Sequence, residues 1–474
     1  MKKVMIQSRG GLWSLLLVSG LLTGIIFATT QDPTKPAQPK PQEEEEPVAL
    51  TERSKPTPTV QSVEVTPDQF ANFRTPMVNA NGEIAVFGLH TQPGVINGSG
   101  QRLYLRTLDG NWQPLLLQGE ETLDTHLKLI ELTKPSITSR KEATFISQFS
   151  PKKANEEKAS PVIDQNDPAY YRPAVPNLGI FRKTAEGIRT LLLMGVEVPN
   201  MPSTLMGLSN LSSNEKGTTA FIGTYVEPDG RGLFYHANDK LSIIARSGQK
   251  IGVNEASTFS EHYYPSDINE QDEVAFLGRT GEKSGIFLAS PKGVEIVAMS
   301  GRLSPVKGGK FIGFGNRTPG INNKGEIVFV GFFDGPDAGR AVFVKPAVGP
   351  LRMVLRSGQP VAGTTYNFTD FTSVGINDQG DILFVASYGG RSRGIFLKTA
   401  KGIVPIALVN QPIPGGTRED LYNHFTQPSF NSQGDVVFYA QWRTPKTGID
   451  VGVFWRDPKG EVKLLFKRGD LMPK

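Results

Sequence analysis

The stretch Ile376-Asn377-Asp378-Gln379-Gly380-Asp381-Ile382-Leu383-Phe384 decides the fold, because the chain repeats its pattern. Two close copies have Asn322 and Asn431 at the place of the asparagine. Weaker copies start at Asn79, Thr138, Asn214 and Asn269. The seven copies start 53 to 76 residues apart. A repeat of this length indicates one supersecondary unit that is too small to bury its own apolar face.

One unit, residues 360–410, shows what each copy is expected to form. Apolar runs at 368–376, 381–386, 394–397 and 403–408 predict four strands separated by turns. In the first turn, Asn377 can accept hydrogen bonds from the backbone ahead of it, and Gly380 supplies a positive φ. Four antiparallel strands per unit predict an all-β fold, a seven-bladed β-propeller.

A closed ring is favoured over an open solenoid. Neither terminal repeat resembles a polar cap, and an open array of strands would expose edges that promote aggregation. We expect the ring to close where blade 1, starting near Phe70, packs against blade 7. Residues 61–65 are expected to add a strand that joins the two ends.

Composition excludes several classes of function. The 474 residues include 51 Gly and 35 Pro but no Cys, so disulfides, thiol catalysis and Cys-ligated metals are excluded. The net charge of +5 falls to +2 without the three basic residues before position 10, and no basic run with interleaved aromatic residues occurs. We therefore expect no nucleic-acid partner. We also expect no cofactor, no metal and a monomer.

The N-terminus predicts export. Basic residues precede an uncharged apolar run in residues 10–30, which is typical of a signal peptide or a retained N-terminal membrane anchor helix. Residues 31–60 contain seven Pro and four consecutive Glu, and we expect a disordered linker there. The predicted domains are thus 1–30, 31–60 and the propeller at 61–474. The expected location is periplasmic, cell-surface or secreted, with membrane contact only through the N-terminal segment.

The repeats resemble those of bacterial exported tandem-repeat proteins with the NxxGxxAF motif. The residues that carry the resemblance are Asn214-x-x-Gly217-x-x-Ala220-Phe221, the Ala275-Phe276 pair after Asn269, and the three close copies. Blade geometry is also similar to that of TolB-like propellers. Repeat 2 departs from the pattern with Thr138 and Lys141, and repeat 4 with Asp272. The resemblance implies a fold and export, but no reaction.

The longest insertion, residues 150–177, is one candidate binding site. Paired tyrosines beside Arg and Asp can form a contact patch for a sugar or a protein, although a tolerated loop is the alternative. Its candidate residues are Asp164, Asp167, Tyr170, Tyr171 and Arg172. The same face of a propeller would carry the loop residues Arg391 and Arg393.

A second candidate site is the row of residues that stand seven positions before the asparagine position in each copy of the pattern. The row comprises Asn72, Glu131, Gly207, His262, Gly315, Asp370 and His424. Its titratable members, Glu131, His262, Asp370 and His424, are expected near the channel mouth. There they would bind a ligand or a metal, run acid–base chemistry or serve as ordinary polar residues.

Two functions remain open from the sequence. The preferred one is an exported, envelope-associated, non-enzymatic binding or scaffold module for protein or glycan. The alternative is an extracellular polysaccharide or ester hydrolase or lyase with its site at the channel mouth. Convergence of the titratable row on one point would favour the enzyme.

Overall fold

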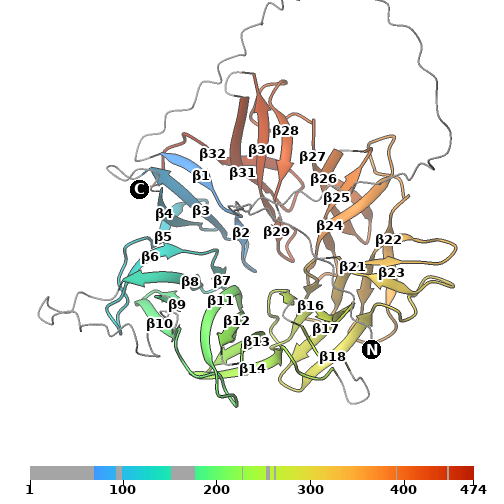
Figure 1. Cartoon of the computed structure of the whole chain (residues 1–474). Coiled ribbons are helices and arrows are strands. Elements are labelled where there is room, and N and C mark those ends of the chain that lie inside the picture. Colours follow the sequence, from blue (N-terminus) through green and yellow to red (C-terminus); the bar gives the residue numbers. More distant parts are fainter. Residues whose placement is uncertain are drawn as a thin grey trace, which may run out of the picture. The chain divides into compact units, whose positions relative to one another are not determined.

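The propeller is seen in a computed structural model that describes residues 69–91, 99–150, 177–226, 228–251, 257–260, 263–315, 317–390, 392–426, 428–445 and 448–473. Every regular element in these ranges is a β-strand, and the strands form seven antiparallel sheets. The sheets surround a central axis as blades (Figure 1). The prediction of an all-β, seven-bladed propeller is confirmed. The predicted N-terminal segments and the strand at 61–65 lie outside the described residues.

Each blade is built from one continuous stretch of chain. Blade 1 holds β1 (Phe70–Phe73), β2 (Met77–Val78), β3 (Ile84–Thr91), β4 (Ser99–Arg106) and β5 (Trp112–Leu117). Blade 2 holds β6 (Lys128–Leu132), β7 (Ser136–Ile137), β8 (Ala143–Ser150), β9 (Leu178–Thr184) and β10 (Gly187–Leu193). Blade 3 holds β11 (Thr204–Ser213), β12 (Thr219–Val226), β13 (Gly230–Ala237) and β14 (Lys240–Arg246). Blade 4 holds β15 (Tyr263–Pro265), β16 (Val274–Thr280), β17 (Lys283–Ser290) and β18 (Gly293–Met299).

The remaining blades follow the same order. Blade 5 holds β19 (Phe311–Gly313), β20 (Gly320–Ile321), β21 (Ile327–Phe333), β22 (Gly339–Lys345) and β23 (Arg352–Arg356). Blade 6 holds β24 (Phe368–Ile376), β25 (Ile382–Tyr388), β26 (Ser392–Thr399) and β27 (Gly402–Leu408). Blade 7 holds β28 (Leu421–Phe425), β29 (Ser429–Phe430), β30 (Val436–Thr444), β31 (Gly448–Arg456) and β32 (Val462–Lys467).

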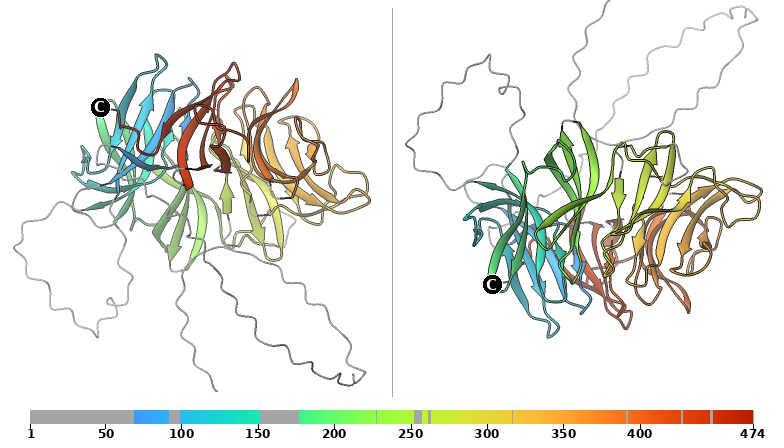
Figure 2. Two further views of the ribbon diagram at one scale, coloured as in Figure 1. Left: turned by 90° about the horizontal axis from the view of Figure 1, so that it is seen from above. Right: turned by 90° about the horizontal axis from the view of Figure 1, so that it is seen from below.

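The first strand of each blade lies nearest the axis. In four blades it is interrupted, so that the short strands β2, β7, β20 and β29 pair with the same neighbour further along. Each interruption contains a proline: Pro76, Pro135, Pro319 and Pro428. Proline has no N–H to contribute to a ladder, which explains why pairing stops there. The edge-on views show the blades side by side around the ring (Figure 2).

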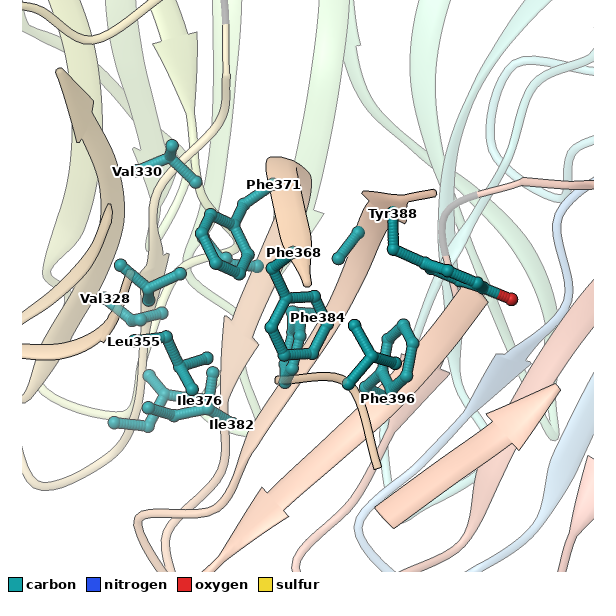
Figure 3. Close-up of a cluster of buried hydrophobic side chains, with 14 of the residues drawn as sticks. Val328, Val330, Leu355, Phe368, Phe371, Ile376, Ile382, Phe384, Tyr388 and Phe396 are labelled. Atoms are coloured by element: carbon teal, nitrogen blue, oxygen red, sulfur yellow. The ribbon is translucent and has the colours of Figure 1, made fainter. Parts of the chain in front are cut away.

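The core lies between neighbouring blades. Residues 382–386 of β25 are all buried, as the continuous apolar run predicts for a strand covered on both faces. Between blades 5 and 6, aromatic rings from β24, β25 and β26 pack against valines of β21 (Figure 3). The rings of Phe368 and Phe396 are 5.1 Å apart and edge to face. Such aromatic pairs add to the free energy gained by burying apolar area.

The repeated asparagines connect the blades as well as shaping the turns. The Oδ1 atom of Asn377 accepts from the backbone N–H groups of Gln379 and Asp381, at 3.1 and 2.9 Å. Its Nδ2 donates across the blade junction to the carbonyl of Asn431 at 3.0 Å. The same cross-blade bond is made by Asn79, Asn214, Asn269, Asn322 and Asn431. We call this series the asparagine belt, and it passes through the junction between blades 7 and 1.

The two repeats that depart from the pattern still bond to a neighbouring blade. Thr138 of blade 2 has no amide to donate, and there the backbone N–H and hydroxyl of Ser139 bind the carboxylate of Glu215 in blade 3, at 2.6 and 2.7 Å. In blade 4, Asp272 takes the glycine position with a φ of 59°. Its carboxylate accepts from Asn214 at 2.7 Å. The residue after the asparagine also bonds to the next blade at other junctions, so the Ser139 contact belongs to a second series of bonds beside the belt.

Ring closure uses the same contacts as every other junction. The N–H of Phe70 donates to the carbonyl of Asp470 at 3.0 Å, and the N–H of Gly469 donates to the carbonyl of Phe70 at 2.9 Å. At the junction of blades 5 and 6, Gly358 and Phe368 form the equivalent pair. Side chains of blades 1 and 7 also share one buried cluster. The expected packing of blade 1 on blade 7 is confirmed.

The turn glycines adopt the predicted conformation, with φ of 75° at Gly325, 80° at Gly380 and 97° at Gly434. We expect Gly380→Val to lower the free energy of unfolding by about 1–3 kcal/mol, because a β-branched residue is strained at positive φ. Urea unfolding measures the change. Gln379→Val, in the same turn and also exposed, is the control and should leave stability nearly unchanged. Equal stability of the two variants would contradict the strain argument.

Candidate functional site

The candidate site is a cluster of arginines around one carboxylate at the end of blades 5 and 6. Asp370 follows a bulge near the start of β24, where the pairing with β25 shifts by one residue. Its Oδ1 atom accepts from the N–H of Phe371 at 2.8 Å. The bulge thus fixes the orientation of the carboxylate, as bulges near functional sites often do.

Two guanidinium groups share the other oxygen of Asp370. Arg317 Nη2 lies 2.8 Å and Arg340 Nη1 lies 3.1 Å from Asp370 Oδ2. Both guanidinium groups also lie over the ring of Phe332, at 5.1 and 5.4 Å from its centroid. The aromatic face and the carboxylate together orient both arginines.

A third arginine lies within electrostatic reach. Across blade 6, Asp370 pairs with Ser387 and Ser387 pairs with Arg393, so the three residues form one row at the same end of the sheet. Burial lowers the pKa of Arg317, and Asp370 opposes this while the charges of Arg340 and Arg393 add to it. Three arginines and one carboxylate leave an excess of two positive charges in what we call the arginine cluster.

His424 occupies the position in blade 7 that corresponds to Asp370 in blade 6. It follows the equivalent bulge in β28 and pairs with Gln441. Partial burial and the positive charge of Arg393 both lower the pKa of His424, so the imidazole is neutral at pH 7.

The junction between blades 1 and 2 carries a simpler version of this arrangement. Arg74 Nη2 lies 3.7 Å from Glu131 Oε1, and the guanidinium lies over the ring of Phe87. Arg74 also donates to the carbonyl of Leu132 at 3.1 Å. Here one arginine faces one carboxylate, and the charges balance.

The predicted row is brought together only in part. Glu131 and Asp370 belong to separate ion pairs, on blades 2 and 6. Within the described ranges, no group of three His, Asp or Glu side chains could hold a metal ion. In blade 5 the residue after the bulge is Gly313, not Gly315, because two extra residues follow it. Several candidates lie outside the described residues: Asp164, Asp167, Tyr170, Tyr171, Arg172, His262 and Arg391.

Arg317 was missed by the sequence analysis, although a signal for it exists. The tripeptide Arg-Thr-Pro stands five residues before the repeated asparagine in two blades, at 74–76 and 317–319. In both cases the next blade has an acidic residue, Glu131 or Asp370, seven residues before its own copy of the pattern. This pairing of positions across neighbouring repeats predicts both ion pairs.

The central channel is a cavity of about 670 Å³ lined by residues of all seven blades. Lys134 and Asp267 are the charged residues in its lining. The arginine cluster lies beside this cavity, next to the lining residue Thr318. No helix within the described ranges is long and apolar enough to cross a membrane.

Comparison with known families identifies the chain. A family of unknown function, DUF7453, matches residues 43–283 and 178–473, and the chain belongs to this family. No curated protein matches the chain. The similarity to NxxGxxAF proteins stays a prediction.

Solved propellers are similar in fold alone. The β-propeller domain of the trilobed protease from Pyrococcus furiosus shares 12% identity over 85% of this chain and 100% of its own, with a TM-score of 0.43. The lectin of Aleuria aurantia, solved with Fucα1-6GlcNAc, shares 12% over 74% of this chain and 100% of its own, with a TM-score of 0.32. A puromycin hydrolase shares 10% over 87% of this chain and 58% of its own, with a TM-score of 0.45. Likenesses this distant do not indicate a function.

Proposed function

We propose that the protein is an exported, non-enzymatic binding or scaffold module that presents one face of its propeller to a protein or glycan. The arginine cluster is the observation that carries this proposal. The cluster lies at the end of the ring where the strands nearest the axis begin. Arg340 keeps 49% of its side chain exposed there. A rigid ring that orients such side chains suits recognition.

The carboxylates that an enzyme would need at this site, Glu131 and Asp370, are held in ion pairs. Glu131 is paired with Arg74, and Asp370 is held by two arginines. Acid–base catalysis needs a carboxyl group that is free to exchange a proton with a substrate. The arrangement therefore favours binding over hydrolysis.

The proposal is tested by screening the full-length chain against a glycan array and against separated envelope proteins. We expect saturable binding, reduced at least tenfold by Arg393→Ala or by Tyr170→Ala with Tyr171→Ala. Subcellular fractionation of the native host should place the chain outside the cytoplasm. Turnover of a polysaccharide or ester by the purified protein, lost in Glu131→Gln or Asp370→Asn, would overturn the proposal in favour of the enzyme.

A further inference from the structure

We infer that the arginine cluster recognises an oxyanion carried by an acidic glycan, a sugar chain with carboxylate or sulfate groups. This inference rests on the proposed binding function and names the class of its ligand. Charge, donor geometry and an exposed aromatic residue at the same end of blade 6 support it.

The charge excess distinguishes this junction from the one between blades 1 and 2. Arg74 and Glu131 show that a blade junction of the same design is satisfied by one arginine and one carboxylate. Arg317 has only 16% of its side chain exposed, yet the charges of Arg340 and Arg393 act on it. Like charges held together in a partly buried place cost free energy unless an anion joins them. A bound oxyanion would supply that missing negative charge.

The donors are oriented for such a ligand. Asp370 Oδ2 takes one contact from each of the two arginines, and each guanidinium has five N–H donors in a planar fork. Stacking on Phe332 holds both forks in place. Planar forks match carboxylate and sulfate oxygens in pairs, which a lysine ammonium does not. Arg340, being half exposed, is the group that an incoming ligand meets first.

An exposed tyrosine favours a sugar as the carrier. Tyr366 has 51% of its surface exposed and packs against Gly389 in the loop between β25 and β26. It precedes Asp370 by four residues, which corresponds to at most about 13 Å along an extended chain. An exposed aromatic face beside a few oriented polar groups is typical of ligand sites, and a pyranose ring can stack on it. Two or three linked sugars would reach from Tyr366 to the cluster.

Isothermal titration of the full-length protein tests the inference with three probes of equal length. These are a galacturonate oligosaccharide, a sulfated heparin-derived oligosaccharide and a neutral galactose oligosaccharide. We expect one or both acidic probes to bind at least tenfold more tightly than the neutral one. Arg340→Gln should weaken that binding at least tenfold, and Tyr366→Ala should weaken it severalfold. Raising the salt concentration should weaken it as well.

Arg74→Gln is the matched control, because it removes the equivalent arginine from the balanced junction. It should leave the affinity for acidic probes unchanged, and melting curves confirm that each variant is folded. Equal binding of neutral and acidic probes, or unchanged binding by Arg340→Gln, overturns the inference while the binding function stands. Binding of poly-glutamate in preference to both acidic sugars assigns the cluster to an acidic protein and also overturns it. If nothing binds in these titrations or in the array and envelope screens, the proposed function fails with it.

Discussion

Asn322→Ala is expected to lower the free energy of unfolding by about 3–5 kcal/mol, far more than a typical polar substitution. The side chain is 4% exposed and lies in the asparagine belt. Its Nδ2 donates to the carbonyl of Asn377 and to the carboxylate of Glu326, at 2.9 and 2.8 Å. Its Oδ1 accepts from two backbone N–H groups of its own turn. Alanine would remove all four bonds, one of which, to the carbonyl of Asn377, is fully buried.

Urea unfolding of Asn322→Ala beside Asn323→Ala measures this effect. Asn323 also bonds across the junction, to Asp378, but it is exposed. Water can replace its contacts, so we expect a loss below about 1 kcal/mol. Similar losses in the two variants would show that the belt asparagines act only through their local turns.

Phe466→Ala is expected to cost about 3–5 kcal/mol and to loosen the closing junction first. Phe466 packs against Phe70 and Trp112, with ring centroids 4.9 and 4.6 Å away. In blades 5 and 6 the fourth-strand residue at the equivalent position is smaller. It is Leu355 in blade 5 and Ala407 in blade 6, and each pairs with the same position of the third strand as Phe466 does in blade 7. Truncation therefore leaves a cavity between blades 7 and 1.

Hydrogen exchange of two amides locates the effect. The N–H of Phe70 bonds to Asp470 across the closing junction, and the N–H of Phe368 bonds to Gln359 across the junction of blades 5 and 6. Phe466→Ala should accelerate exchange at Phe70 more than at Phe368. Leu355→Ala, the matched control, should do the reverse. Uniform acceleration in both variants would mean that the ring opens only as a whole.

Local turn chemistry made most of the fold predictable. Gly380 needs a positive φ, and Asn377 caps its own turn, so the copy number and the blade boundaries follow from residues close in sequence. The cross-blade role of the asparagine amide was not predicted, because its partner lies some 54 residues away in the next repeat. Long-range partners of this kind are set by how blades stack, which a single repeat does not encode.

The candidate site was only half predicted, for a related reason. Counting back seven residues from each asparagine placed Asp370 correctly beside the start of its strand. The same count failed in blade 5, where two additional residues follow the bulge, and it did not identify Arg317 as the partner of Asp370. The ion pair joins positions in two neighbouring repeats, which a count made within each repeat does not reveal.

The ring has no structural beginning. Among the described residues, no blade takes a strand from the far end of the chain, and the bonds between Gly469 and Phe70 repeat those found between consecutive blades. Gln69 and Leu471 lie side by side there. Circular permutation could join these positions and open the chain at another inter-blade loop while keeping all seven blades intact. For the same reason, a whole blade is the natural unit by which such a protein gains or loses length through gene duplication.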